Sequence, residues 1–302
     1  MSSDNCKEVR VYFYYLTVER IKDRCDESVY KIVEVAKILS RFFSFLVEKG
    51  LNDRKIDNEN LMEVAWLDKF SDIGNGNYNL IFKSAKYNHV RNEIDTITME
   101  ELGTRKRPQD ADQEKTHLCI RLNEKRKSFL VVHEGNSDGL PIGRILVYLN
   151  NKLREYCEES ENEYQYKLIS EIIPGDDFLE ELKKSTKPIT LLELTIESTL
   201  LDPYLKIADR DSVRKTIKVL IKRPKGYRKM PENLIKSYYE NMQSDSIIQR
   251  VTAKYSNEKI ADTDIFRMKR NLNVRKADVT NEVDSDDFFI KAQNFISQNG
   301  GQ

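Results

Sequence analysis

Stretches rich in β-branched and aromatic residues recur along the whole chain, and they restrict it to folds built around β-sheet. Segments with the 3.6-residue apolar spacing of amphipathic helices lie between them. The expected strands are residues 9–18, 61–67, 78–85, 117–122, 129–133, 164–173, 189–201, 215–222, 247–255 and 265–276. The expected helices are residues 27–49, 140–155, 176–184, 231–243 and 285–298. This pattern predicts an α+β protein with mostly antiparallel sheets and helices on one face.

The chain has 302 residues, which is long for one core because domains most often hold about 100–150 residues. We therefore expect two closely packed lobes. Residues 1–160 form the N-terminal α+β lobe, and residues 161–302 form a C-terminal α+β lobe with a basic sheet face. The hydrophobic content of 39% excludes wholesale disorder.

No stretch approaches the roughly 20 consecutive apolar residues of a membrane helix, and the N-terminus lacks the apolar core of a signal peptide. We expect a cytoplasmic protein without membrane insertion. Cys6, Cys25, Cys119 and Cys157 are scattered, so neither a disulfide framework nor a zinc finger is indicated. No cofactor is expected.

Charge is distributed unevenly although the formal net charge is zero. Residues 155–197 contain twelve Asp or Glu against four Lys, whereas residues 206–276 contain nineteen Lys or Arg against eight Asp or Glu. Such asymmetry points to a polyanionic partner for the C-terminal third, or to docking of the acidic segment on the basic one.

The three last expected strands alternate apolar and cationic residues. Because side chains two apart share a face of a strand, each strand would turn its cations outward. A loop of residues 222–229 adds further cations and leads to a helix start at Pro231, where backbone N–H groups favour an anion. The predicted nucleic-acid-binding residues are Lys218, Lys222, Arg223, Lys225, Tyr227, Arg228, Lys229, Arg250, Lys254, Arg267, Lys269, Arg270 and Arg275.

This surface permits three interpretations. It can bind phosphate backbones, with Tyr227 stacking on a base or sugar. It can bind an acidic protein segment, either residues 155–197 of this chain or a partner. It can also serve solubility, since exposed strands commonly carry Lys.

Catalytic signatures are weak. A hairpin of residues 117–122 and 129–133, with Ile120 opposite Leu130, would place His117 across from His133, a pair that could bind a metal. Neither a phosphate-binding G-x-x-x-x-G-K-[ST] loop nor a G-x-S-x-G turn occurs. The pairs Asp176–Asp177 and Asp286–Asp287 both begin expected helices, where Asp acts as a cap or dipole partner.

Residues 78–84, the segment Ser128–Gly135 with its following glycine turn, and the basic strand and loop 217–229 carry a resemblance to the RexA-like phage-exclusion proteins. The KwaB proteins of the Kiwa defence system are a more distant match. The resemblance implies sequence-independent DNA binding in antiphage defence, and it carries over no individual residue.

The sequence thus predicts a DNA-binding protein that contacts backbone phosphates, with DNA favoured over RNA. A metal-dependent nuclease and a protein-binding adaptor remain alternatives. A homodimer and a partner defence protein are further candidates for its interactions.

Overall fold

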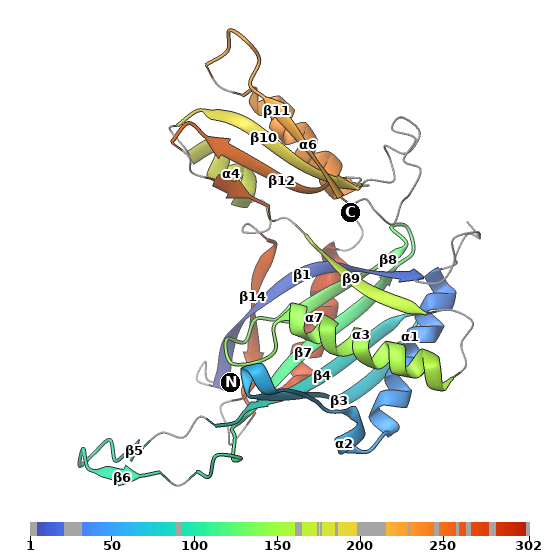
Figure 1. Cartoon of the computed structure of the whole chain (residues 1–302), viewed down its shortest axis with the longest axis vertical. Helices are drawn as coiled ribbons and strands as arrows, with labels where there is room; N and C mark the ends of the chain where they lie inside the picture. The colour runs from blue at the N-terminus through green and yellow to red at the C-terminus, as the bar shows by residue number, and fades with distance from the viewer. Residues whose placement is uncertain are drawn as a thin grey trace. The chain divides into compact units, whose positions relative to one another are not determined.

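The computed structural model describes residues 5–20, 32–88, 92–104, 106–160, 165–173, 175, 177–184, 187–197, 216–228, 230–244, 248–257, 260–263, 267–277 and 282–299 (Figure 1). Its sheets are antiparallel and helices pack on them, which confirms the α+β class. The chain divides into two compact units. Unit 1 comprises residues 1–170 and 270–302, and unit 2 comprises residues 171–269.

An eight-stranded sheet forms the centre of unit 1, in the order β14-β1-β8-β7-β4-β3-β2, with β9 also paired to β1. Its strands are β1 Cys6–Arg20, β2 Ile56–Asn58, β3 Glu63–Gly74, β4 Asn77–Lys86, β7 Gln113–Asn123, β8 Ser128–Glu134, β9 Tyr166–Ile172 and β14 Lys269–Arg275. β3 and β4 correspond to the expected strands 61–67 and 78–85 and form an antiparallel hairpin, joined by a tight turn in which Asn75 and Gly76 both have positive φ (54° and 72°). A Cβ at Gly76 would lie 2.7 Å from Cβ of Leu122, so glycine is required there by packing as well as by conformation.

Helices cover both faces of this sheet (Figure 1). The helices of unit 1 are α1 Ile32–Glu48, α2 Leu51–Arg54, α3 Ile142–Glu159 and α7 Ser285–Asn299, with a 3-10 turn, η2 Glu59–Leu61. Tyr78 of β4 donates a hydrogen bond to the carbonyl of Ala36 in α1 (2.5 Å), whereas its neighbour Asn79 contacts Gln293 of α7 (3.2 Å). Because adjacent strand residues point to opposite faces, α1 and α7 lie on opposite sides, and the expected one-sided arrangement does not hold here.

Aromatic side chains fill the layer between α1 and the sheet. Phe43 lies 5.4 Å from Phe70 and 5.8 Å from Tyr78, ring centroid to centroid. α1 buries Ile32, Ala36, Leu39, Phe43 and Leu46 at the 3.6-residue spacing expected of its helix, together with Val35 and Phe42, whereas Val33 is 44% exposed. The expected helix start at residues 27–31 lies outside the described residues.

A four-stranded sheet in the order β11-β10-β12-β13 forms unit 2, with two helices packed on one of its faces. Its elements are α4 Asp177–Lys184, β10 Ile189–Glu197, β11 Thr216–Lys222, α6 Glu232–Ser244, β12 Ile248–Tyr255 and β13 Ile260–Asp262. Phe178 of α4 stacks on Tyr239 of α6 (5.4 Å between centroids), and both side chains are buried with Leu192 and Val251 of the sheet.

The division of the chain differs from the expected boundary at residue 160. The expected last strand, residues 265–276, becomes β14, which joins the sheet of unit 1 beside β1, and α7 packs on β7. The C-terminal segment therefore returns to complete the first unit. A short local sequence pattern could not reveal this return, because it depends on pairing between segments about 260 residues apart.

The hairpin of β7 and β8 forms, but its predicted register is wrong by one residue. Ile120 pairs with Val131, and Leu118 pairs with His133. Asn123 pairs with Ser128, and Lys127 just before the second strand has positive φ (51°). This left-handed residue makes the connecting loop one residue longer than the pairing of Ile120 with Leu130 would require, and it shifts every cross-strand pair.

A small hairpin protrudes from the sheet of unit 1 (Figure 1, β5 and β6). It consists of β5 Glu93–Ile94 and β6 Glu101–Gly103, which pair antiparallel. In the segment that follows it, the side chain of Arg107 contacts the Asp110 carboxylate (2.9 Å).

Candidate nucleic-acid interface

Four of the predicted cations lie on one face of the unit 2 sheet. Thr195 of β10 pairs with Lys218 on one side and with Arg250 on the other, and Leu191 pairs in the same way with Lys222 and Lys254. Residues that pair directly project from the same face of a sheet. This face, opposite α4 and α6, is called the open face below, and its cations form two rows that cross the strands.

The open face also contains carboxylates that were not predicted from the sequence. Glu193 lies in the middle, with Oε1 2.7 Å from Nζ of Lys218 and Oε2 3.2 Å from Nζ of Lys254. The hydrogen bond from Lys218 is the main reason that the pKa of Glu193 is lowered, against the opposing effect of burial. Asp262 of β13 lies 3.6 Å from Nε of Arg250. Glu193 belongs to the sheet itself, as a residue of β10 between β11 and β12, so it reduces the charge of the basic face from within.

Both rows owe their position to the central strand β10. Its Leu192 and Leu194 are buried beneath the helices, so Leu191, Glu193 and Thr195 must point to the open face. β11 alternates in the same sense, with Lys218 and Leu220 exposed and the side chains between them half-buried. The expected alternation is therefore present on β11 and β12.

The loop after β11 adds exposed cations. Lys222, Arg223, Lys225 and Arg228 are all exposed, and Tyr227 is 61% exposed. The backbone N–H of Arg223 donates to the carbonyl of Thr190 (3.0 Å), and its guanidinium donates to the carbonyl of Arg228 (2.8 Å). Within the described residues, no carboxylate lies within ion-pair distance of Lys222, Lys225 or Arg228. Lys229 lies outside the described residues.

The helix after this loop is a weaker anion site than expected. α6 begins at Glu232, whose carboxylate occupies the first turn. The N–H groups of Leu234 and Ile235 both donate to the carbonyl of Pro231. The bond from Ile235 is the ordinary first bond of the helix, so only the N–H of Leu234 is withdrawn from the free donors of the first turn, and the negative charge of Glu232 opposes an anion at the positive helix end.

The remaining predicted cations do not join the open face, so the proposed three-strand ladder is wrong in its third strand. Arg267 lies outside the four strands of the unit 2 sheet, and Lys269 lies 3.6 Å from the carboxylate of Asp177. Arg270 and Arg275 belong to unit 1. Arg275 contacts two carboxylates at the start of α7, Asp287 at 3.6 Å and Asp284 at 3.9 Å.

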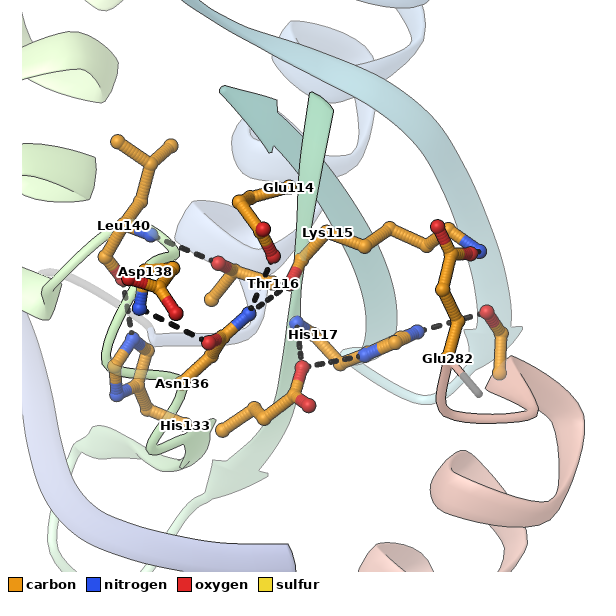
Figure 2. A network of polar contacts seen from close by, with 11 residues as sticks. Glu114, Lys115, Thr116, His117, His133, Asn136, Asp138, Leu140 and Glu282 are labelled. Carbon is orange, nitrogen blue, oxygen red and sulfur yellow. Dashed lines mark hydrogen bonds and ion pairs between the residues drawn. The ribbon is translucent and has the colours of Figure 1, made fainter. Parts of the chain in front are cut away.

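A second polar cluster lies in unit 1, around His117 (Figure 2). Nδ1 of His117 lies 2.7 Å from Oε2 of Glu134, and Nε2 lies 2.7 Å from Oγ of Ser285. The backbone N–H of His117 donates to the same Glu134 oxygen (3.1 Å). Beside the cluster, Lys115 contacts Glu282 (2.6 Å), and a cavity of about 470 Å³ is lined by both of these and by Glu134.

The order serine, histidine, carboxylate is that of an activated nucleophile, but the surroundings of His117 favour a structural role. His117 is only 1% exposed, and its ring stacks on Phe288 of α7 (4.9 Å). Ser285 is the first residue of α7, and Asp284 before it caps the helix by accepting the N–H of Asp287 (2.9 Å). We interpret the cluster as the polar clamp that holds α7 on the sheet.

The expected histidine pair is wrong. His133 pairs with Leu118, so it points to the face opposite His117, where its Nε2 lies 2.9 Å from the carbonyl of Leu140. Cys119 is buried, and burial raises its pKa to about 12. Among the described residues, no three His, Cys, Asp or Glu side chains gather in a way that could hold a metal ion.

The fold and the site define the class: an α+β protein of two units, one of which leaves a cation-rich sheet face open. Comparison with known proteins finds no family model and no curated protein that matches the chain. Across the described ranges, no helix combines the length and the apolarity that a bilayer crossing requires.

Proposed function

We propose that unit 2 binds nucleic acid, DNA in preference to RNA, through backbone phosphates on its open face and the adjoining loop. The observation that carries this proposal is the continuity of Lys222 and Lys254 on the face with the exposed cations of residues 223–228. Cations spread in two rows over one sheet face suit a repeating chain of phosphates better than a single small anion.

The spacing of the rows supports this proposal. Lys218 and Arg250 are separated by two strand spacings, which is about 10 Å, and Lys218 and Lys222 by four residues along a strand, which is about 13 Å. These dimensions let one face contact several phosphates along a duplex backbone. Glu193 and Asp262 reduce the charge of the face, so the exposed loop supplies most of the expected affinity.

The decisive experiment is a fluorescence anisotropy titration of duplex DNA over a salt series. A variant with Lys222→Gln, Lys225→Gln and Arg228→Gln should bind all sequences more weakly. Its log–log salt dependence should be shallower by roughly 0.9 for each phosphate that the variant no longer neutralises. Matched duplex RNA tests the preference for DNA.

Exposed cations on another part of unit 2 provide the control. The variant Lys183→Gln, Lys184→Gln and Lys187→Gln removes the same charge from α4 and from the segment that follows it. α4 packs on the face of the sheet opposite the open face. The variant should bind like the wild type. Equal losses of affinity in both triple variants would attribute binding to overall charge and reject the open face as the site.

We further propose a role in antiphage defence, which rests on the resemblance to RexA-like proteins. Plating efficiency of phages on cells that express the wild type or the two triple variants tests it. Only the variant altered in residues 222–228 should lose protection.

A further inference from the structure

The hairpin that protrudes from unit 1, residues 92–104 and called the arm below, exposes a set of large apolar side chains. Ile97 is 91% exposed and Met99 is 69% exposed, and Ile94 and Leu102 are about half exposed beside them. Single exposed apolar residues are common, but four within one short hairpin form a patch that favours contact with another molecule.

The tip of the arm is folded, and its backbone holds the apolar residues outward. Oδ1 of Asp95 accepts hydrogen bonds from the N–H groups of Ile97 (2.7 Å) and Thr98 (3.0 Å). The N–H of Met99 donates to the carbonyl of Asp95 (2.8 Å), and Met99 has positive φ (60°). The exposure of Ile97 and Met99 is therefore a property of a defined turn.

The charge of the arm indicates what kind of surface it fits. Residues 92–104 contain Glu93, Asp95, Glu100 and Glu101 and no Lys or Arg. A partner must present cations, because an acidic surface would repel the arm. It must also present apolar side chains, because a purely polar surface would leave those of the arm exposed to water.

The open face of unit 2 has both properties. Leu220 is 56% exposed directly beside Glu193 and between Lys218 and Lys222 on β11, and Ile260 is 48% exposed opposite Lys254. Leu220 and Ile260 contribute neither charge nor hydrogen bonds to phosphate binding. The arm and the open face are complementary, since one carries carboxylates and the other cations and both expose apolar side chains, so a second copy of the chain can bury the side chains of each.

We propose that the arm of one copy docks on the open face of unit 2 of a second copy. Ile97 and Met99 then cover Leu220 and Ile260, and the arm's carboxylates meet the cations of the face. The contact is small beside a standard interface of about 800 Å² per partner, so the association is weak and salt-sensitive. Because it occupies the proposed phosphate site, nucleic acid competes with it.

Sedimentation velocity over a concentration series tests the docking. The arm variant Ile97→Ser with Met99→Ser, and the face variant Leu220→Ser with Ile260→Ser, should each remain monomeric where the wild type associates. The control Val147→Ser with Ile290→Ser removes exposed apolar residues from α3 and α7 and should associate like the wild type.

Mixing the two variants is the strictest test of the proposal. The arm variant retains an intact face and the face variant retains an intact arm, so the mixture should form a one-to-one complex although neither variant self-associates. Absence of that complex, a monomeric wild type, or unchanged association of either variant would overturn the proposal.

The docking and the DNA binding fail separately. The arm variant should bind duplex DNA at least as tightly as the wild type, because it loses only the competitor. If neither the wild type nor the variants bind DNA, but the mixed variants still form the one-to-one complex, the proposed function is rejected and the docking stands.

Discussion

The two sheets differ in how many of their faces are covered. In unit 1, β4 has a nearly continuous run of buried residues, because α1 lies on one side of it and α7 on the other. In unit 2, β11 alternates between half-buried and exposed residues, because α4 and α6 pack on one side. Continuous apolar strands therefore indicate a sheet covered on both faces, and alternating strands indicate a face left for binding.

Truncation on the two sides of the unit 2 sheet should give the largest contrast. Phe178→Ala removes a fully buried ring that stacks on Tyr239, and we expect it to destabilise unit 2 by about 3–5 kcal/mol. Leu220→Ala on the open face should change the free energy of unfolding by less than about 0.5 kcal/mol. Urea unfolding followed by circular dichroism measures both. A large loss of stability for Leu220→Ala would mean that the open face is covered after all.

The polar clamp of unit 1 should give the next largest effect. Glu134→Ala leaves the backbone N–H and the ring of the buried His117 without their acceptor, which should cost about 1–3 kcal/mol. Glu134→Gln keeps an acceptor oxygen and should cost less. Lys184→Ala, which breaks a surface pair with Glu180 on α4, should cost about 0–1 kcal/mol.

Hydrolysis of generic ester substrates by the wild type, abolished in Ser285→Ala, would contradict the structural interpretation of this clamp. The predicted result is that Ser285→Ala changes only the stability, measured by the same urea unfolding.

The contrast between the sheets also explains what could be predicted from the sequence. Strand composition and the 3.6-residue period depend on local burial, so the strands of the β3–β4 hairpin, the helices and the four cations of the open face follow from them. The order of the strands in a sheet cannot be predicted from such local patterns. β10 lies between β11 and β12, and only that order brings Glu193 between Lys218 and Lys254. The positive φ of Lys127 likewise has no strong sequence signal, since Gly or Asn usually occupies such positions.

Removing the central carboxylate should strengthen nucleic-acid binding. Glu193→Gln releases Lys218 and Lys254 from a negative partner, and we expect duplex DNA to bind about two- to fivefold more tightly at low salt. The same anisotropy titration measures the change. Glu193→Gln should also strengthen docking of the acidic arm, which competes with DNA. The comparison is therefore made in the arm variant, with and without Glu193→Gln. Weaker binding by Glu193→Gln would mean that Glu193 positions the lysines for their ligand.

The smallest effect concerns the titration of Glu193 itself. Its pKa is lowered, chiefly by the hydrogen bond from Lys218. The ion pairs on the open face are therefore complete above the ordinary glutamate pKa of about 4.3 and persist below it. They should be lost only as the pH falls through the lowered value. Carboxyl carbon shifts recorded by NMR give the midpoint, which should rise in Lys218→Gln and rise less in Lys254→Gln. Equal midpoints in both variants and the wild type would show that solvent screens these pairs. The open face would then present its lysines to a ligand without competition from Glu193.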